Sequence, residues 1–328
     1  MSHQLAELKL MLRNNLFLDL DEHALRDNKP EGLVCSFLGM RLASAYQPIF
    51  RLNGEVSGRE ALLRASSIIH GVLTPETAFE LAHEARRLVQ FDRLVRTLHL
   101  LGYSRGFDEQ ELLFLNVHPR LLTSVSDHGR TFEQILHYYS VPTSRVVIEI
   151  KESAIESDER LREAVNNYRS LGYRIAVDDF GAAHSGIARI NNQQRRYDSL
   201  VSDNHELDRV LSLAPDIVKL DGAVIQAAEQ TSAAAAVIHG LVNIFHGIGA
   251  EVVIEGIETA AQLAIAQDTG ADLLQGYYLS YPHFVAEPRG HLCPTGKPVP
   301  SPQPSPALHG REQTIRCAKL TINERLAA

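Results

Sequence analysis

The chain has few cysteines, no excess of positive charge and no long apolar run, and each shortage argues against a class of protein. The three cysteines, Cys35, Cys293 and Cys317, are far apart and form no Cys-x-x-Cys pair, which argues against a thiolate zinc site and a disulfide framework. The net charge of −8 argues against binding to a nucleic acid polymer or to an anionic membrane. No apolar stretch is long enough to span a bilayer. The first residues lack the order of a signal peptide, so we expect a cytoplasmic protein.

The 328 residues divide by composition into three segments. Residues 1–40 are predicted to form an N-terminal helical extension, because leucines from Leu5 to Leu16 recur at helix-like spacings. Residues 287–328 are crowded with proline, which predicts a disordered tail. Residues 41–286 alternate apolar strands with helical patterns, which predicts one large α/β domain.

The alternation predicts about eight strands, with helices between most of them. The expected strands are Ser44–Arg51, Glu55–Arg64, Leu112–Val117, Val146–Ile150, Arg174–Asp178, Ile217–Leu220, Glu251–Ile254 and Leu273–Leu279, and the expected helices include Glu76–Arg87, Glu159–Leu171, Ala227–Gly247 and Ala260–Thr269. Such a chain forms either a closed (β/α)₈ barrel or an open doubly wound sheet, and the strand count favours the barrel. The short turn Leu52-Asn53-Gly54 predicts that the first strand is antiparallel to the second.

Polar residues stand where these strands end, and a barrel gathers such ends at one mouth. They are Glu60, Asn116, Glu149, Asp178, Asp179, Lys219, Glu255 and Gln275. The adjacent carboxylates of Asp178 and Asp179 repel each other unless a cation lies between them. Oxygen ligands without cysteine or histidine favour Mg²⁺ or Mn²⁺, and two such ions catalyse phosphoryl transfer. Asp179-Phe-Gly181 also matches a protein-kinase motif, but the glycine-rich loop and the His-Arg-Asp segment of kinases are missing.

The order of these motifs resembles the EAL-domain cyclic di-GMP phosphodiesterases of bacterial second-messenger signalling, from about Tyr46 to Pro282. The motifs that carry the resemblance are Tyr46-Gln-Pro-Ile49, Glu60-Ala-Leu-Leu-Arg64, Leu115-Asn-Val-His118, Glu149-Ile-Lys-Glu152-Ser153, Asp178-Asp-Phe-Gly181, Lys219-Leu-Asp221, Glu255-Gly-Ile-Glu258 and Gln275-Gly-Tyr-Tyr278. Because so many motifs occur in one order, chance does not explain the match.

The resemblance implies a role for each matched position. The implied metal ligands are Glu60, Asn116, Glu149, Asp178 and Asp179, with Asp178 bridging two ions. Lys219 is implied to orient or deprotonate the attacking water, with its pKa lowered by the nearby cations. Glu255 is implied to complete the water and metal network, and Glu152 to hold the loop after Asp179. The implied substrate-binding residues are Gln47, Leu62, Arg64, Gln275, Asp221, Glu258 and Pro282.

The implied reaction is two-metal activation of water, which attacks one phosphodiester of cyclic di-GMP in line and opens the ring to linear pGpG. The resemblance further implies a homodimer, and a regulatory protein partner is an additional expectation. Two rival functions stay open. One is a catalytically weak or inactive EAL-like receptor that binds cyclic di-GMP and acts through protein partners. The other is a protein-interaction domain that no longer binds nucleotide.

Two departures from the family pattern affect these expectations. After Asp-Asp-Phe-Gly the chain reads Ala182-Ala-His-Ser-Gly186 in place of a Thr-Gly-Tyr-Ser-like run, which removes a hydroxyl near Glu152 and weakens the expected second metal position. The interval from Asp179 to Lys219 is about twice the expected length. The extra polar segment near Asn191–Val210 is either a regulatory flap that alters the dimer or a tolerated surface insertion.

Overall fold

The computed structural model describes residues 13, 23–28, 31–124, 129–155, 159–182 and 205–285. Within them, one sheet of 12 strands organises the fold. The strands are β1 (Arg26–Asn28), β2 (Gly32–Phe37), β3 (Met40–Arg51), β4 (Val56–Ser67), β5 (Gly71–Leu73), β6 (Leu112–Asn116), β7 (Val146–Lys151), β8 (Arg174–Phe180), β9 (Ile217–Leu220), β10 (Glu251–Ile254), β11 (Leu273–Leu274) and β12 (His283–Phe284).

Eight of these strands close into a barrel. In order around the barrel they are β3, β4, β6, β7, β8, β9, β10 and β11, and β11 pairs back onto β3. Strands β4 and β6 to β11 run parallel to one another, whereas β3 is antiparallel to both of its neighbours. The turn between β3 and β4 contains Gly54 at a φ of 85°, a conformation that glycine adopts readily. The predicted barrel with an antiparallel first strand is confirmed.

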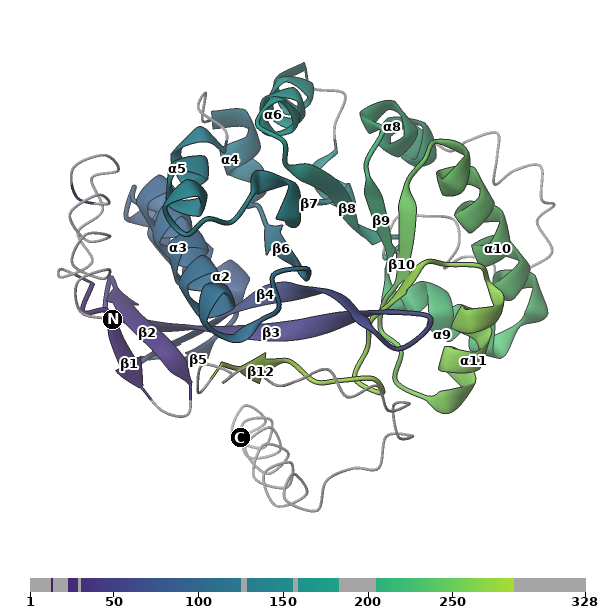
Figure 1. Cartoon of the computed structure of the whole chain (residues 1–328), viewed down its shortest axis with the longest axis horizontal. Helices are drawn as coiled ribbons and strands as arrows, with labels where there is room; N and C mark the ends of the chain where they lie inside the picture. The colour runs from purple at the N-terminus through teal and green to yellow at the C-terminus, as the bar shows by residue number, and fades with distance from the viewer. Residues whose placement is uncertain are drawn as a thin grey trace, which may run out of the picture. The chain divides into compact units, whose positions relative to one another are not determined.

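Helices cover the outside of the barrel (Figure 1). They are α2 (Pro75–Glu84), α3 (Leu88–Gly106), α4 (Pro119–Ser124), α5 (Arg130–Tyr138), α6 (Glu159–Ser170), α8 (His205–Leu213), α9 (Gly222–Gln230), α10 (Ser232–Gly247) and α11 (Ala260–Asp268), with short 3₁₀ turns η1 (Thr143–Arg145) and η2 (Glu152–Ala154). Each helix lies between barrel strands in the sequence, so its apolar side covers the sheet. Among the described helices, none combines the length and the apolar character needed to cross a bilayer.

The N-terminal extension is not helical where the structure describes it. Residues Arg26–Asn28 and Gly32–Phe37 form β1 and β2, and they continue the sheet because β2 pairs antiparallel with β3 and β1 pairs antiparallel with β2. The side chains of Leu33, Val34 and Cys35 are all buried, so this apolar run is covered on both faces and pairs as a strand. The helical prediction is therefore wrong for these residues. The leucine pattern from Leu5 to Leu16 and the tail 287–328 lie outside the described residues.

Two predicted element boundaries are also wrong. The helix expected over Ala227–Gly247 is two helices, because Thr231 is extended (φ −146°, ψ 137°) and its side chain caps α10 by accepting a hydrogen bond from the Ala234 amide. The strand expected over Leu273–Leu279 ends at Leu274. The chain turns at the following Gly276, whose Cα lies so close to the Ile257 backbone that an added Cβ would be 2.1 Å from the Ile257 carbonyl oxygen.

A histidine is buried where α3 packs on the barrel. His99 is 5% exposed, and its Nδ1 lies 2.7 Å from the hydroxyl oxygen of Ser44 on β3. Burial, with a smaller contribution from the positive charges of Arg96 and Arg64, lowers the pKa of His99 from 6.5 to about 3. His99 is therefore neutral in the folded protein at every pH at which the protein is handled.

This buried histidine predicts a pH dependence of stability. As the pH falls below 6.5, His99 becomes protonated in the unfolded chain but stays neutral in the folded chain. The free energy of unfolding therefore falls. This contribution is fully present above pH 6.5, and about 2 kcal/mol of it is lost between pH 8 and pH 5. Urea denaturation at several pH values should show that, between pH 8 and pH 5, the parent loses about 2 kcal/mol more stability than His99→Gln does. The exposed His70→Gln serves as the control and should follow the parent. Equal pH dependence in all three proteins would contradict the prediction.

Candidate active site

The barrel interior has an apolar layer with a polar layer directly above it. The apolar layer is a separate buried cluster of Ile49, Leu112, Phe114, Val147, Ala176, Ile217, Val253 and Leu273. Residues two positions apart on a strand point to the same side. Two positions after members of this cluster stand Asn116, Glu149, Asp178, Lys219, Glu255 and Gln275. Gln47 stands two positions before Ile49, because β3 runs in the opposite direction. The strand geometry thus brings these side chains together at the C-terminal mouth, as predicted.

Lys219 stands at the centre of four carboxylates. We call these four residues, Glu60, Glu149, Asp178 and Glu255, the acidic ring. Its Nζ lies 2.7 Å from Glu149 Oε1, 2.8 Å from Glu255 Oε1, 2.9 Å from Asp178 Oδ1 and 3.3 Å from Glu60 Oε2. The Lys219 side chain is 1% exposed, and that of Glu255, the most exposed of the ring, is 15% exposed. One ammonium group thus leaves three of the four carboxylates unbalanced when all are ionised.

Two amide side chains fix the orientation of the acidic ring. Asn116 Nδ2 donates hydrogen bonds to Glu60 Oε1 and to Glu149 Oε2, both at 3.0 Å. Gln275 Nε2 donates to Glu60 Oε2 at 2.9 Å. Because both amide groups present their NH₂ to carboxylates, their oxygens are left for another partner. The side-chain oxygen of Gln275, Oε1, is buried and accepts no hydrogen bond from any described residue.

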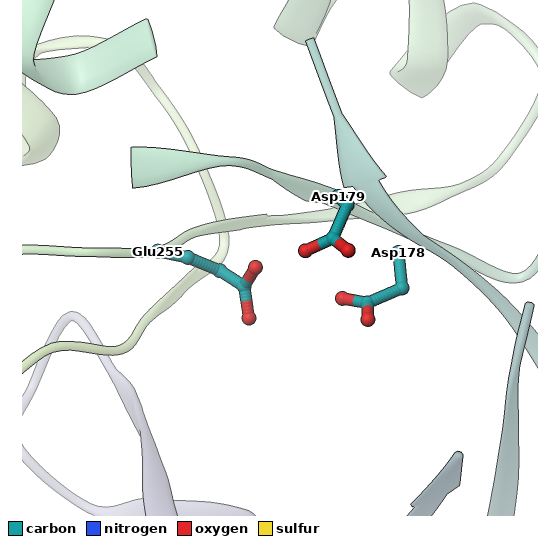
Figure 2. A group of neighbouring side chains, drawn as sticks. All are labelled: Asp178, Asp179 and Glu255. Atoms are coloured by element: carbon teal, nitrogen blue, oxygen red, sulfur yellow. The ribbon is translucent and has the colours of Figure 1, made fainter. Parts of the chain in front are cut away.

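A β-bulge places the two adjacent aspartates on the same side of β8. In a regular strand, the side chains of Asp178 and Asp179 would point to opposite faces. The pairing of β8 with β9 shifts register between Val177 and Phe180, and Asp179 has a left-handed φ of 57°. Figure 2 shows the resulting arrangement, in which the carboxylates of Asp178, Asp179 and Glu255 point toward one another. One oxygen from each lies within 4.8 Å of the others, a spacing that suits a metal ion.

Burial and mutual charge interactions change the pKa values of Lys219 and of the carboxylates around it. Burial raises the pKa of Glu149 well above its ordinary value, and attraction to Lys219 offsets this only in part. Burial also raises the pKa of Glu255, to about 8, against the attraction of Lys219. For Lys219, burial lowers the pKa, but its four carboxylates outweigh burial and the pKa lies well above its ordinary value. The lowered pKa expected for Lys219 assumed bound cations, and the acidic ring by itself has the opposite effect.

The oxygen atoms at the mouth of the barrel fit hard divalent cations. They come from the carboxylates of the acidic ring and from the amides of Asn116 and Gln275, and Mg²⁺ and Mn²⁺ prefer such ligands. Glu149 Oε1 and Asp178 Oδ1 are buried and lie within ion-pair distance of Lys219, yet neither accepts an aligned hydrogen bond. Buried carboxylate oxygens without aligned donors are costly unless a cation is bound. The ligands that the resemblance implies, Glu60, Asn116, Glu149, Asp178 and Asp179, all supply such oxygens, and their assignment stays a prediction.

The predicted substrate-binding residues differ in their position relative to the acidic ring. Gln47 on β3 pairs opposite Glu60, and its Nε2 donates to the Ser280 carbonyl oxygen at 3.4 Å. Leu62 and Arg64 follow on β4 and are half-buried, as is Pro282 just before β12. Asp221 instead caps α9, accepting a hydrogen bond from the Ala223 amide at 2.8 Å. Glu258 is exposed before α11, and its amide donates to Gln262 Oε1. Among described residues, neither Asp221 nor Glu258 bonds to the acidic ring.

Glu152 holds the chain just after the two aspartates. Its Oε2 accepts a hydrogen bond from the Gly181 amide at 2.9 Å, which links η2 to the end of β8. The rest of the unusual loop, residues 183–186, and most of the inserted segment near 191–210 lie outside the described residues. The described part of that segment begins α8.

One charged residue near the site was not predicted. Lys151 is the last residue of β7, and its Nζ donates to Asp179 Oδ2 at 2.8 Å. In the sequence, Lys151 lies inside the motif Glu149-Ile-Lys-Glu152, but nothing in that motif indicates its partner. The contact depends on the parallel pairing of β7 with β8, which sets Lys151 opposite Asp178.

Comparisons with known proteins agree with this geometry. The family model described as the EAL domain matches residues 36–194 and 198–282. The chain is 28% identical over 251 residues to the cyclic di-GMP phosphodiesterase RocR of Pseudomonas aeruginosa, covering 73% of this chain and 58% of that protein. It is 30% identical over 179 residues to YkuI, an EAL-domain protein of Bacillus subtilis, covering 53% of this chain and 39% of that protein. The chain thus spans well under two thirds of the length of these relatives.

Solved structures share the same barrel. The structure of YkuI in complex with cyclic di-GMP and calcium has a TM-score of 0.58 at 26% identity, covering 87% of this chain and 62% of that chain. The cyclic di-GMP complex of the PaMucR phosphodiesterase has a TM-score of 0.58 at 25% identity, covering 74% of this chain and 92% of that chain. With the barrel, the ordered motifs and the match of the family model over most of its length, the chain belongs to the EAL domain family.

Proposed function

We propose that this chain hydrolyses cyclic di-GMP to linear pGpG with the help of Mg²⁺ or Mn²⁺. The observation that carries the proposal is the acidic ring around Lys219 at the mouth of the barrel. RocR is named as a phosphodiesterase for this nucleotide, and the YkuI structure contains the nucleotide together with a divalent cation. Both findings support the same substrate class for this chain.

The proposed metal sites are those that the resemblance implies, and the described contacts are compatible with them. Glu60, Asn116, Glu149 and Asp178 would hold one ion, and Asp178 and Asp179 would hold a second. A bound divalent cation supplies Lewis acidity, which makes water nucleophilic near neutral pH and neutralises phosphate charge. The protein's part is to fix the ligands before the cation arrives, which Asn116 and Gln275 do by their bonds to the ring.

The proposed reaction needs a water molecule, an in-line phosphodiester and a place for one proton. The water oxygen forms a bond to phosphorus while the bond from phosphorus to the leaving ribose oxygen breaks, and that oxygen leaves with a proton from solvent. Lys219 lies within ion-pair distance of all four carboxylates, and we assign it to orient the attacking water. Glu255 is the most exposed member of the ring. Bound cations would lower its raised pKa, and we assign the ionised carboxylate as the group that accepts the water's proton and passes it on.

Substrate recognition is assigned to the residues along the rim. Arg64 would face a phosphate with its guanidinium group, and Gln47, Leu62 and Pro282 would contact the nucleotide beside it. Asp221 and Glu258 are proposed to act at greater distance, because Asp221 is occupied as a helix cap. A homodimer and a regulatory protein partner also remain proposals from the resemblance, and sedimentation with and without nucleotide tests the dimer.

Glu152 gives a prediction that separates metal binding from chemistry. Glu152→Ala removes the acceptor for the Gly181 amide and should release the chain after Asp179. A hydrogen bond to a charged group is worth about 1.5–3 kcal/mol, so the Mn²⁺ concentration for half-maximal turnover should rise by about 10- to 100-fold. Turnover at saturating Mn²⁺ should change little. Glu152→Gln keeps an acceptor oxygen and should stay near the parent. A loss of turnover that Mn²⁺ does not restore would contradict this role.

The rival function is a receptor that binds cyclic di-GMP without cleaving it, and the altered loop at Ala182 favours it. Chromatography of reactions with Mg²⁺ or Mn²⁺ separates the two functions. The proposal expects pGpG from the parent and none after Glu60→Ala or with a chelator. Intact nucleotide bound to folded parent protein would favour the receptor, and the absence of both turnover and binding would favour an interaction domain.

A further inference from the structure

The protein carries its own cation beside the proposed second metal site. Lys151 Nζ and Asp179 Oδ2 are 2.8 Å apart, and both side chains are partly exposed, at 42% and 36%. The β7–β8 register places Lys151 opposite Asp178, and the bulge at Asp179 turns that carboxylate toward it. The ammonium group thus contacts a carboxylate that belongs to the group of Asp178, Asp179 and Glu255.

The two candidate metal positions differ in their surroundings. The three carboxylate ligands of the first position, Glu60, Glu149 and Asp178, are buried around Lys219, whose charge is shared among four carboxylates. The second position depends on Asp179, whose charge is already balanced by Lys151 alone. A divalent cation bound there must either displace the ammonium group or bind beside it against like-charge repulsion.

We propose that Lys151 is a positioning residue that competes with the second divalent cation for Asp179, so that the site binds one ion tightly and the second weakly. The inference rests on the metal site of the proposed function. The occupancy of the second position then varies with the concentration of free metal, because the ammonium group holds Asp179 in place when the cation is absent. Full loading then requires more free metal than the first position needs.

Mn²⁺ binding without nucleotide tests the proposal directly. Calorimetric titration of the parent should resolve one tight and one weak class of Mn²⁺ sites. Lys151→Met removes the charge at similar side-chain length and should tighten the weak class about tenfold, because a charge repulsion within a few ångströms is removed. The tight class should not change. A partly exposed ion pair contributes less than about 1 kcal/mol to stability, so this variant should fold.

Four further proteins make the result specific. Lys151→Arg keeps the charge and should keep the weak class weak. Arg105→Met removes the cation of a comparable surface pair with Asp27 far along the sequence, and should leave both classes unchanged. In an Asp179→Asn background, Lys151→Met should have no effect on the weak class, which completes a double-mutant cycle.

The outcomes separate this inference from the proposed function. Two equal Mn²⁺ sites in the parent, or an unchanged weak class after Lys151→Met, would overturn the role of Lys151 and leave the phosphodiesterase proposal standing. A parent protein that binds no Mn²⁺ would overturn the metal site itself and both proposals with it.

Discussion

Replacing Lys219 with methionine should destabilise the metal-free protein by about 3–5 kcal/mol, because it leaves buried carboxylates without their ammonium partner. The loss should appear as a lower urea midpoint in the presence of a chelator. Mn²⁺ should restore much of it, since a bound cation replaces the missing charge. Turnover at saturating Mn²⁺ should fall by about 10²–10⁴, the usual effect of losing a group that moves or orients protons.

A surface ion pair provides the control for Lys219→Met. Arg174 on β8 lies 3.8 Å from Glu251, and both side chains are exposed to a considerable degree. Arg174→Met also removes one cation beside a carboxylate, but it should change stability by less than about 1 kcal/mol and leave turnover near the parent. If Lys219→Met proved as mild as Arg174→Met, the acidic ring would not be the charged centre described above.

The second large effect concerns the glycine that follows Glu255. Gly256 has a φ of +64°, and an added Cβ would lie 2.5 Å from the Cα of Gly222, at the start of α9. Gly256→Ala therefore forces two backbone segments apart in addition to straining its own conformation. We expect a loss of about 2–5 kcal/mol in the free energy of unfolding. Turnover should also fall, because Glu255 moves with its neighbour.

Gly249→Ala is a matched control for Gly256→Ala. Gly249 has a comparable φ of +84°, but an added Cβ would meet nothing within 4 Å. This variant should show only the conformational strain, about 1–2 kcal/mol, with unchanged turnover. The difference between the two variants isolates the close contact of Gly256 with Gly222. Equal losses of stability would show that this contact does not matter.

Much of the fold follows from the sequence because the barrel strands are apolar runs that end in polar residues. Val147 is followed two positions later by Glu149, and Ile217 by Lys219. This spacing predicts both the strand and the face to which the polar side chain at its end points. The antiparallel first strand follows from a short turn with Gly54. By contrast, β1 and β2 were missed because they form by adding to β3 at the edge of the sheet, and the leucine spacing upstream favoured a helix.

The candidate site was predictable in membership but not in detail. Residues at strand ends meet wherever a barrel closes, so the ring around Lys219 required no knowledge of side-chain positions. The bulge at Asp179 was not predictable, because it arises from a register shift between β8 and β9. The ion pair of Lys151 with Asp179 depends on that bulge and therefore needed the structure.

The most direct test of the proposed hydrolysis is the fate of water oxygen. The parent protein is incubated with cyclic di-GMP and Mn²⁺ in ¹⁸O-labelled water, and the products are examined by mass spectrometry. We expect pGpG that carries the label in its terminal phosphate, and no labelled product with a chelator or after Glu60→Ala. Intact, unlabelled cyclic di-GMP recovered from folded parent protein loaded with Mn²⁺ would contradict it.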